Sequence, residues 1–197
     1  MKKIGCIFSL AIIGLILAIG MWVMGIYNNM IMLKEPATSQ WANVESAYQK
    51  RIDLVPNLVN TVKGYAKHEK ETLTEIIEAR ANATKINIDA SNLTPENIAA
   101  FQSAQSGLSS SLSKLLATFE AYPDLKANQN FMALQTELTS IENEIKFERQ
   151  KFNTKIQDYN TYVKKAPQNI IASFFSFDEM GYFKAERGAE KAPEIEF

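Results

Sequence analysis

The only histidine of the chain, His68, stands among three glutamates, a combination that suggests a metal site or a general base. On a helix, His68, Glu71 and Glu75 share one face. A di-metal site in a helical bundle takes a Glu-x-x-His unit from each of two helices, and a zinc protease motif needs a second histidine where this chain has Thr72. We therefore predict no metal, no cofactor and no catalytic activity, and give His68 a structural or interaction role.

A second group of polar side chains surrounds Pro56 and comprises Arg51, Asp53 and Asn57. They could satisfy backbone groups that the proline leaves unpaired and pair with a neighbouring helix, or they could line a ligand-binding groove. We prefer the structural interpretation. The same interpretation is given to three polar residues that interrupt apolar helical faces, Glu69, Gln105 and Glu148, which we expect to fix the register between helices.

Composition excludes several classes of function. The chain has 197 residues, enough for one domain with accessory segments, and a net charge of −1, which does not fit a nucleic-acid binder. A single cysteine, Cys6, rules out a disulfide bond within the chain. There is no glycine-rich phosphate-binding loop either.

The N-terminal stretch Ile4–Tyr27 is uncharged and apolar, and at about 1.5 Å per residue it can cross a hydrocarbon core of about 30 Å. Trp22 and Tyr27 sit near its end, where aromatic residues anchor membrane helices. A cleaved signal peptide, with Ala18 and Gly20 as the small residues before the cut, is the alternative, but the apolar run continues past that site. We predict a membrane anchor that contacts the lipid bilayer through residues 4–27.

The charges that flank the anchor predict its orientation. Lys2 and Lys3 precede it, whereas Lys34 after it is balanced by Glu35. Because positive residues stay on the cytoplasmic side, we predict a cytoplasmic N-terminus and an extracytoplasmic C-terminal part.

Beyond the anchor, apolar residues recur at spacings of three and four, which is typical of amphipathic helices with heptad-like seams. We predict an all-α protein in which a long antiparallel bundle of three to four helices follows the transmembrane helix. The predicted helices span residues 30–82 with a kink at Pro56, 95–122, and 129–165. The bundle domain is placed at 30–183, after an anchor at 1–29 and before a flexible tail at 184–197.

Local sequence marks two helix starts. Thr94, Pro95 and Glu96 combine a capping side chain, a proline suited to the first turn and an acid near the positive end of the helix. Asn128 is a candidate cap for the last long helix.

The chain either continues or reverses at Pro56. The apolar spacing crosses the proline and DLVPN contains no glycine, so we predict a continuous helix that ends near Ala83. On that path the aromatic segment with Phe174, Phe175 and Phe177 lies far from the membrane and caps the bundle. If the chain reversed, four helices would form and this segment would return to the bilayer. An interfacial membrane contact or a partner-binding patch is the alternative to the capping role of this segment.

A continuous helix would leave residues 30–54 without a partner, although Trp41 and its neighbours form an apolar stripe there. Such a stripe needs a partner, so we predict a homo-oligomer and a structural or scaffolding role. A ligand- or protein-binding receptor domain is the alternative.

Several motifs resemble the LemA family of bacterial membrane proteins over nearly the whole chain. They are RIDLVPNLV at 51–59, TVKGYAKHE at 61–69, EAYPDLKAN at 120–128 and the Tyr159-Asn160 pair. Phe152-Asn153 replaces a usual Tyr-Asn pair, and Pro36 is unusual for the family. The resemblance implies a single-pass protein of the bacterial cytoplasmic membrane with a helical bundle, and the family has no agreed enzymatic activity that could be transferred to this chain. Some members are assigned a cytoplasmic C-terminal domain, opposite to the orientation that the charges favour here.

Overall fold

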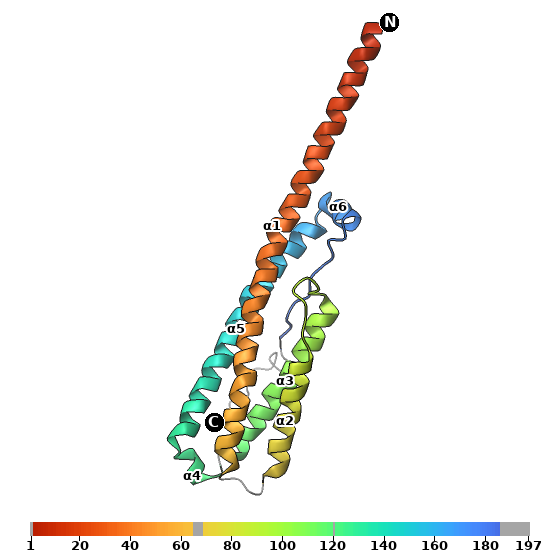
Figure 1. Cartoon of the computed structure of the whole chain (residues 1–197). Coiled ribbons are helices and arrows are strands. Elements are labelled where there is room, and N and C mark those ends of the chain that lie inside the picture. The colour runs from red at the N-terminus through yellow and green to blue at the C-terminus, as the bar shows by residue number, and fades with distance from the viewer. Residues whose placement is uncertain (1, 65–68, 120, 186–197) are drawn as a thin grey trace, which may run out of the picture.

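A computed structural model describes residues 2–64, 69–119 and 121–185, which form helices and no strand. Figure 1 shows one very long helix whose N-terminal half stands alone and whose other half lies in a bundle. The all-α fold with an N-terminal membrane helix and an antiparallel bundle is therefore confirmed. The helices of the described residues are α1 (Lys2–Lys63), α2 (Lys70–Lys85), α3 (Pro95–Phe119), α4 (Pro123–Lys126), α5 (Gln129–Lys164) and α6 (Gln168–Phe174).

The apolar half of α1 projects from the bundle. Every residue from Ser9 to Trp22 is exposed, and α1 is the one helix of the described residues that is long and apolar enough to cross a membrane. Buried positions begin at Ile26 and continue at Met30, Ala37 and Trp41. The same helix therefore supplies both the membrane-spanning part and a wall of the bundle core.

The helix α1 continues through Pro56, as predicted. Proline has no N–H to donate to the carbonyl of Ile52 four residues earlier, which would leave that oxygen unpaired. Arg80 of α2 supplies the missing donor, with its Nε 3.1 Å from the Ile52 oxygen. A side chain from a neighbouring helix thus replaces the lost backbone hydrogen bond.

The predicted helix over residues 30–82 is wrong beyond Lys63. The structure has two helices there, α1 and α2, and α2 runs back beside α1 and packs mainly against α3. Lys63 is the last residue of α1, and Gly64 follows it in a turn. The apolar spacing did not reveal the reversal because α2 also carries an inward stripe, which includes Leu73 and Ile76.

The bundle consists of two helix pairs. α1 packs along α5, and α2 packs along α3 (Figure 1). The predicted unpaired segment 30–54 does not exist as such, since Trp41, Val44 and Tyr48 are all buried within the chain. The apolar stripe that suggested a homo-oligomer is therefore already covered.

Both predicted helix caps are present. The backbone N–H of Asn97 donates to Oγ1 of Thr94 at 3.2 Å, and that of Phe131 donates to Oδ1 of Asn128 at 3.1 Å. The helix expected over 95–122 ends earlier, at Phe119, and a single turn of helix, α4, precedes α5.

After α6 the chain continues without regular structure as the C-terminal segment, residues 175–185. The aromatic part of this segment was predicted at the membrane-distal end of the bundle, and that prediction is wrong. Because the chain reverses after Lys63, α5 ends beside the exit of the anchor, and the Phe177 ring lies 5.3 Å from that of Tyr27 between centroids. Residues 186–197 of the predicted flexible tail lie outside the described residues.

The C-terminal segment then passes close to the start of α3. The backbone N–H of Gly181 donates to the Leu93 carbonyl at 2.9 Å. A β-carbon at this glycine would lie 2.7 Å from the Cα of Pro95, a distance that no real side chain tolerates. Glycine is therefore required for the backbone to approach α3 so closely.

Candidate functional site

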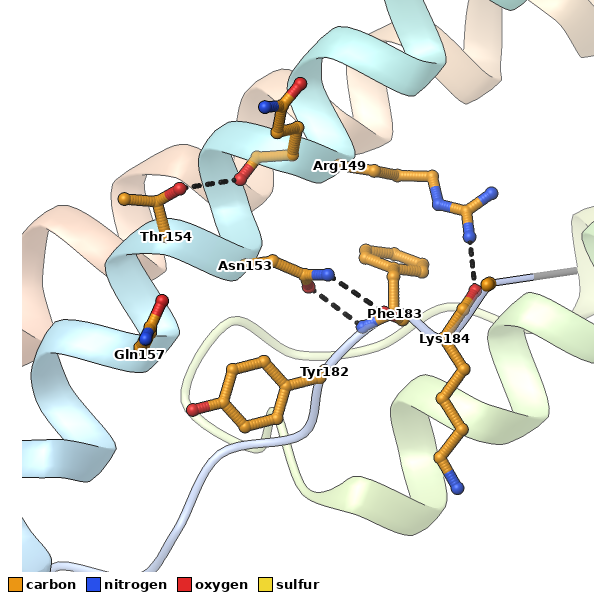
Figure 2. A pocket seen from close by; sticks show the side chains of 9 residues that line it. Arg149, Asn153, Thr154, Gln157, Tyr182, Phe183 and Lys184 are labelled. Carbon is orange, nitrogen blue, oxygen red and sulfur yellow. Dashed lines mark hydrogen bonds between the residues drawn. The ribbon is translucent and has the colours of Figure 1, made fainter. Parts of the chain in front are cut away.

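Two asparagines of α5 hold the C-terminal segment by its backbone. Asn160 donates through Nδ2 to the Met180 carbonyl and accepts at Oδ1 from the Met180 N–H, both at 2.9 Å. Asn153 makes the same pair of bonds to Phe183, at 2.8 and 2.9 Å (Figure 2). Each amide thus pairs with both the N–H and the carbonyl of one residue, as a neighbouring β-strand would, and satisfies backbone groups that would otherwise lack partners.

Further contacts hold the end of this segment. Arg149 donates to the Lys184 carbonyl at 2.8 Å, and Gln102 of α3 donates to the same oxygen and accepts from the Lys184 N–H. Figure 2 shows the hollow between α5 and the segment, which Gln157 and Tyr182 also line. Arg149, Asn153 and Thr154 of its lining donate to backbone carbonyls, and no nucleophile is paired with a base among the residues that line it.

Tyr159 adds a bond near the start of the segment. Its hydroxyl donates to the Asp178 carbonyl at 3.0 Å. Burial, with a smaller contribution from the nearby Asp178 charge, raises the pKa of Tyr159 to about 12. The hydroxyl therefore stays protonated and remains a donor at physiological pH.

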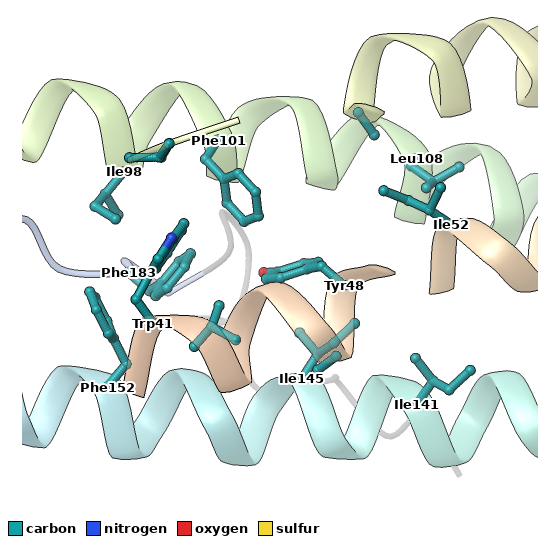
Figure 3. Close-up of a cluster of buried hydrophobic side chains, with 14 of the residues drawn as sticks. Trp41, Tyr48, Ile52, Ile98, Phe101, Leu108, Ile141, Ile145, Phe152 and Phe183 are labelled. Atoms are coloured by element: carbon teal, nitrogen blue, oxygen red, sulfur yellow. The ribbon is translucent and has the colours of Figure 1, made fainter. Parts of the chain in front are cut away.

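An aromatic cluster of five rings fills the space between the helices and the C-terminal segment (Figure 3). Trp41 is fully buried, and its ring centroid lies 5.1 Å from that of Phe101 and 5.6 Å from that of Phe152. Phe183 lies 5.5 Å from Phe152, and Tyr48 lies 5.0 Å from Phe101. Trp41, a candidate interaction residue from the sequence, is thus part of the core.

Arg51 lies next to this cluster with only 2% of its surface exposed. Its guanidinium donates to Oε1 of Glu142 at 2.9 Å, and to the side-chain oxygen of Gln105 at 2.7 Å and its carbonyl at 3.1 Å. The group also lies 5.0 Å from the centre of the Tyr48 ring. One arginine of α1 is therefore bonded to both α3 and α5, and we call these residues the Arg51 centre.

The other residues near Pro56 are not part of this centre. Asp53 and Asn57 are exposed, and Asp53 accepts a hydrogen bond at 2.8 Å from Gln49 of its own helix. They lie on the outer face of α1, so the structure does not bring them together with Arg51. His68 lies outside the described residues.

The polar residues that interrupt the apolar faces do link helices. Gln105 of α3 bonds Arg51 of α1, and Glu148 of α5 accepts from Gln40 of α1. Glu69 lies outside a helix, at the N-cap of α2, and accepts from the hydroxyl of Tyr122, the N-cap of α4, at 2.9 Å. These pairings fit the expected role in fixing the register.

A second aromatic group surrounds the exit of the anchor. Phe175 and Phe177 lie 5.1 and 5.3 Å from Tyr27 between ring centroids. Phe177 is buried, whereas 81% of the neighbouring Phe174 is exposed. The Lys34 ammonium lies 5.9 Å from the centre of the Phe177 ring. The aromatic residues that the sequence singled out thus divide into one buried and two exposed rings.

Among the described residues, no three His, Cys, Asp or Glu side chains gather in a way that could hold a metal ion. Glu75, from the suspected cluster around His68, is paired instead with Lys114 at 2.7 Å. The described residues instead form a fixed helical framework with exposed aromatic side chains near the anchor.

The asparagines that hold the C-terminal segment were missed as site residues. A signal for them exists in the sequence, because Phe152-Asn153 and Tyr159-Asn160 repeat an aromatic-asparagine pair seven residues apart. Seven residues make about two helical turns, so both pairs face the same way on α5. The sequence contained no indication of what the amides would bind.

Comparison with known proteins gives consistent matches. The family model described as the LemA family matches residues 40–197. The magnetosome protein MamQ of Magnetospirillum gryphiswaldense is 25% identical over 190 residues, covering 86% of this chain and 68% of that protein. MamQ 2 of Paramagnetospirillum magneticum is similar to the same extent, with 25% identity over 186 residues. Protein LemA of Metamycoplasma hominis is 25% identical over 142 residues, covering 72% of this chain and 61% of that protein.

Proposed function

The chain belongs to the LemA family, and from that premise we propose that it is a membrane-anchored structural protein that self-associates and has no catalytic activity. It holds its helical bundle in a fixed position beside the bilayer of the bacterial cytoplasmic membrane. The N-terminus lies in the cytoplasm and the bundle on the other side, since Lys2 and Lys3 precede the anchor.

One observation carries this proposal: α1 is unbroken from the apolar half to the end of the bundle. Ile26 at the end of the anchor and Met30 just past it are buried, as is Trp41 further along the same helix. The bundle cannot swivel on its anchor without breaking backbone hydrogen bonds of α1 or separating these packed side chains. A rigid connection of this kind suits a scaffold better than a tethered, mobile receptor domain.

Self-association is proposed through the anchor rather than the bundle. The small residues Ala11, Gly14, Ala18 and Gly25 recur at spacings of three, four and seven, which places them on one face of α1. Space is open around Gly14 and Gly25, with no atom within 4 Å of an added β-carbon. Small residues at such spacing let two membrane helices approach closely.

The mass of the full-length protein in detergent micelles tests this proposal. We expect a defined oligomer at micromolar concentration, and its conversion to a monomer by Gly14→Leu combined with Ala18→Leu. The matched control, Ile12→Leu with Ile16→Leu on another face of the helix, should leave the oligomer unchanged. A monomer for the unaltered chain would overturn the proposed self-association.

The receptor alternative is less well supported. It predicts a binding groove lined by Arg51, Asn57 or His68. The guanidinium of Arg51 is occupied by Glu142 and Gln105, and His68 lies outside the described residues. Asn57, its other proposed ligand-binding residue near the proline, lies on the exposed face of α1. We therefore retain the structural role.

A further inference from the structure

The short helix α6 exposes large apolar side chains beside the membrane anchor. Ile170 is 70% exposed, Phe174 81% and Phe175 43%, while Ile171 and Ala172 on the other face are buried. Figure 1 shows α6 beside α1 at the end of the bundle from which the anchor projects. Phenyl and aliphatic groups exposed side by side are unusual on a surface that faces water.

The position of this patch along α1 identifies what covers it. Phe175 packs against Tyr27, with 5.1 Å between ring centroids, and Tyr27 ends the apolar span that begins at Ile4. Those 24 residues make about 36 Å of helix, already more than the hydrocarbon core of about 30 Å. Tyr27 therefore lies in the headgroup region, and α6, packed beside it, lies at the same depth.

The first charged residue after the span agrees with this depth. Lys34 follows Tyr27 by seven residues, or about 10 Å along the helix axis. Its ammonium approaches the ring of Phe177, a buried residue three positions after the end of α6. An ammonium just outside a ring of aromatic side chains is the arrangement typical of a membrane interface.

We propose that α6 is a second membrane contact, which inserts Ile170, Phe174 and Phe175 into the interfacial region of the same bilayer that the anchor crosses. Lipid covers the exposed apolar face of α6. This face continues directly from a membrane span and lies at headgroup depth, where an apolar surface meets acyl chains rather than water. The contact rests on the proposed membrane insertion of α1. Together with the anchor it gives the bundle two points of attachment and so fixes its rotation about α1.

Fluorescence quenching in phosphatidylcholine vesicles tests this contact with the full-length chain. A Cys6→Ser background carries one new cysteine, labelled with a nitrobenzoxadiazole dye, introduced by Phe174→Cys or, as a matched control, Phe147→Cys. Phe147 is also an exposed phenylalanine, at 55%, but it lies on α5 away from the anchor. A third label, from Leu17→Cys, reports whether the anchor itself is inserted.

We expect a nitroxide-labelled lipid to quench the dye at position 174 several-fold more strongly than the dye at position 147. Iodide in the water should quench the two positions in the opposite order. Quenching of position 174 by iodide to the same extent as position 147 would overturn the contact, and so would protection from both quenchers, which indicates coverage by protein. If position 17 is lipid-quenched and position 174 is not, only this inference fails; if neither is, the proposed anchoring fails as well.

A charge substitution gives an independent measurement. With the dye attached through Ile170→Cys, Phe174→Asp should remove most of the lipid quenching, whereas Phe147→Asp should leave it unchanged. Both replaced side chains are exposed, so neither variant is expected to unfold the bundle, and helix content measured by circular dichroism checks this. Equal lipid quenching in the two variants would contradict insertion of Phe174.

Discussion

The aromatic cluster and the Arg51 centre are neighbours along α1, yet they contribute to the bundle in different ways. The cluster joins four parts of the chain, α1, α3, α5 and the C-terminal segment, through rings that require only contact (Figure 3). The Arg51 centre joins α1 to α3 and α5 through directed bonds to Gln105 and Glu142. The first provides cohesion, whereas the second specifies one alignment of the helices.

Energetics separate the two regions further. A buried aromatic side chain removes about 150–250 Å² from water, at about 25 cal/mol per Å², so each ring stabilises the fold by several kcal/mol. Burying a guanidinium costs desolvation energy that its bonds only offset, so the net stabilisation is small. Losing one partner is nevertheless costly, because the others then remain buried without a bond. We therefore expect that a second substitution can restore the stability lost at the Arg51 centre, but not the stability lost at the aromatic cluster.

The largest effect is expected at Phe183, where the C-terminal segment enters the aromatic cluster. Phe183→Ala should lower the free energy of unfolding by about 3–5 kcal/mol, because it leaves a cavity between four elements. Urea unfolding of the full chain in a mild detergent measures this. Phe174→Ala, which truncates an exposed ring, should change the value by less than about 0.5 kcal/mol in detergent. A loss below about 1 kcal/mol for Phe183→Ala would show that the segment is not part of the core.

A smaller effect is expected for Arg51. Arg51→Ala should cost about 2–3 kcal/mol, less than a fully buried pair because Glu142 keeps 29% of its side chain in contact with solvent. Replacing Arg51 together with its buried partner, Arg51→Met with Gln105→Leu, should restore stability to within about 1 kcal/mol of the native value, since no buried side chain then lacks a bond and water hydrates the partly exposed Glu142 carboxylate. Urea unfolding in the same detergent measures the free energy of unfolding of both variants. An equal loss in both variants would contradict the distinction drawn between the two regions.

The smallest effect concerns Tyr159, which bonds the C-terminal segment. Its ordinary pKa of 10.0 applies to the unfolded chain and the pKa of about 12 to the folded one. The unfolded state therefore ionises first, and the stability linked to this group is complete below pH 10 and lost between pH 10 and 12. Partial screening by solvent limits the loss to about 1–2 kcal/mol.

Comparison of native chain and Tyr159→Phe across this pH range isolates the contribution of the hydroxyl. The native protein should lose more stability than the variant between pH 10 and 12, and the two pH profiles should be parallel below pH 10. Profiles that stay parallel up to pH 12 would indicate that the hydroxyl is not held in the fold.

Helix-forming features were predictable because they depend on residues close in sequence. The caps at Thr94 and Asn128 and the continuity of α1 through Pro56 could be anticipated, although the donor that satisfies the Ile52 carbonyl, Arg80, could not. The reversal after Lys63 was missed because α2 also carries an inward apolar stripe. The spacing of apolar residues is the same whether the chain continues or reverses. Because the reversal was missed, two consequences were missed as well. Trp41 is buried by other parts of the same chain, and Phe177 lies beside the anchor.

By itself, the sequence determined the membrane anchor, the all-α class and the capped ends of two helices, since each follows from composition or from neighbours within a few residues. Only the tertiary structure decided which helices pair, that Arg51 is held by Gln105 and Glu142, and that the aromatic segment lies beside Tyr27. Those contacts join residues many positions apart, and their partners are selected by the packing of the whole bundle. A local pattern can show that a side chain needs a partner, but the fold chooses which one it receives.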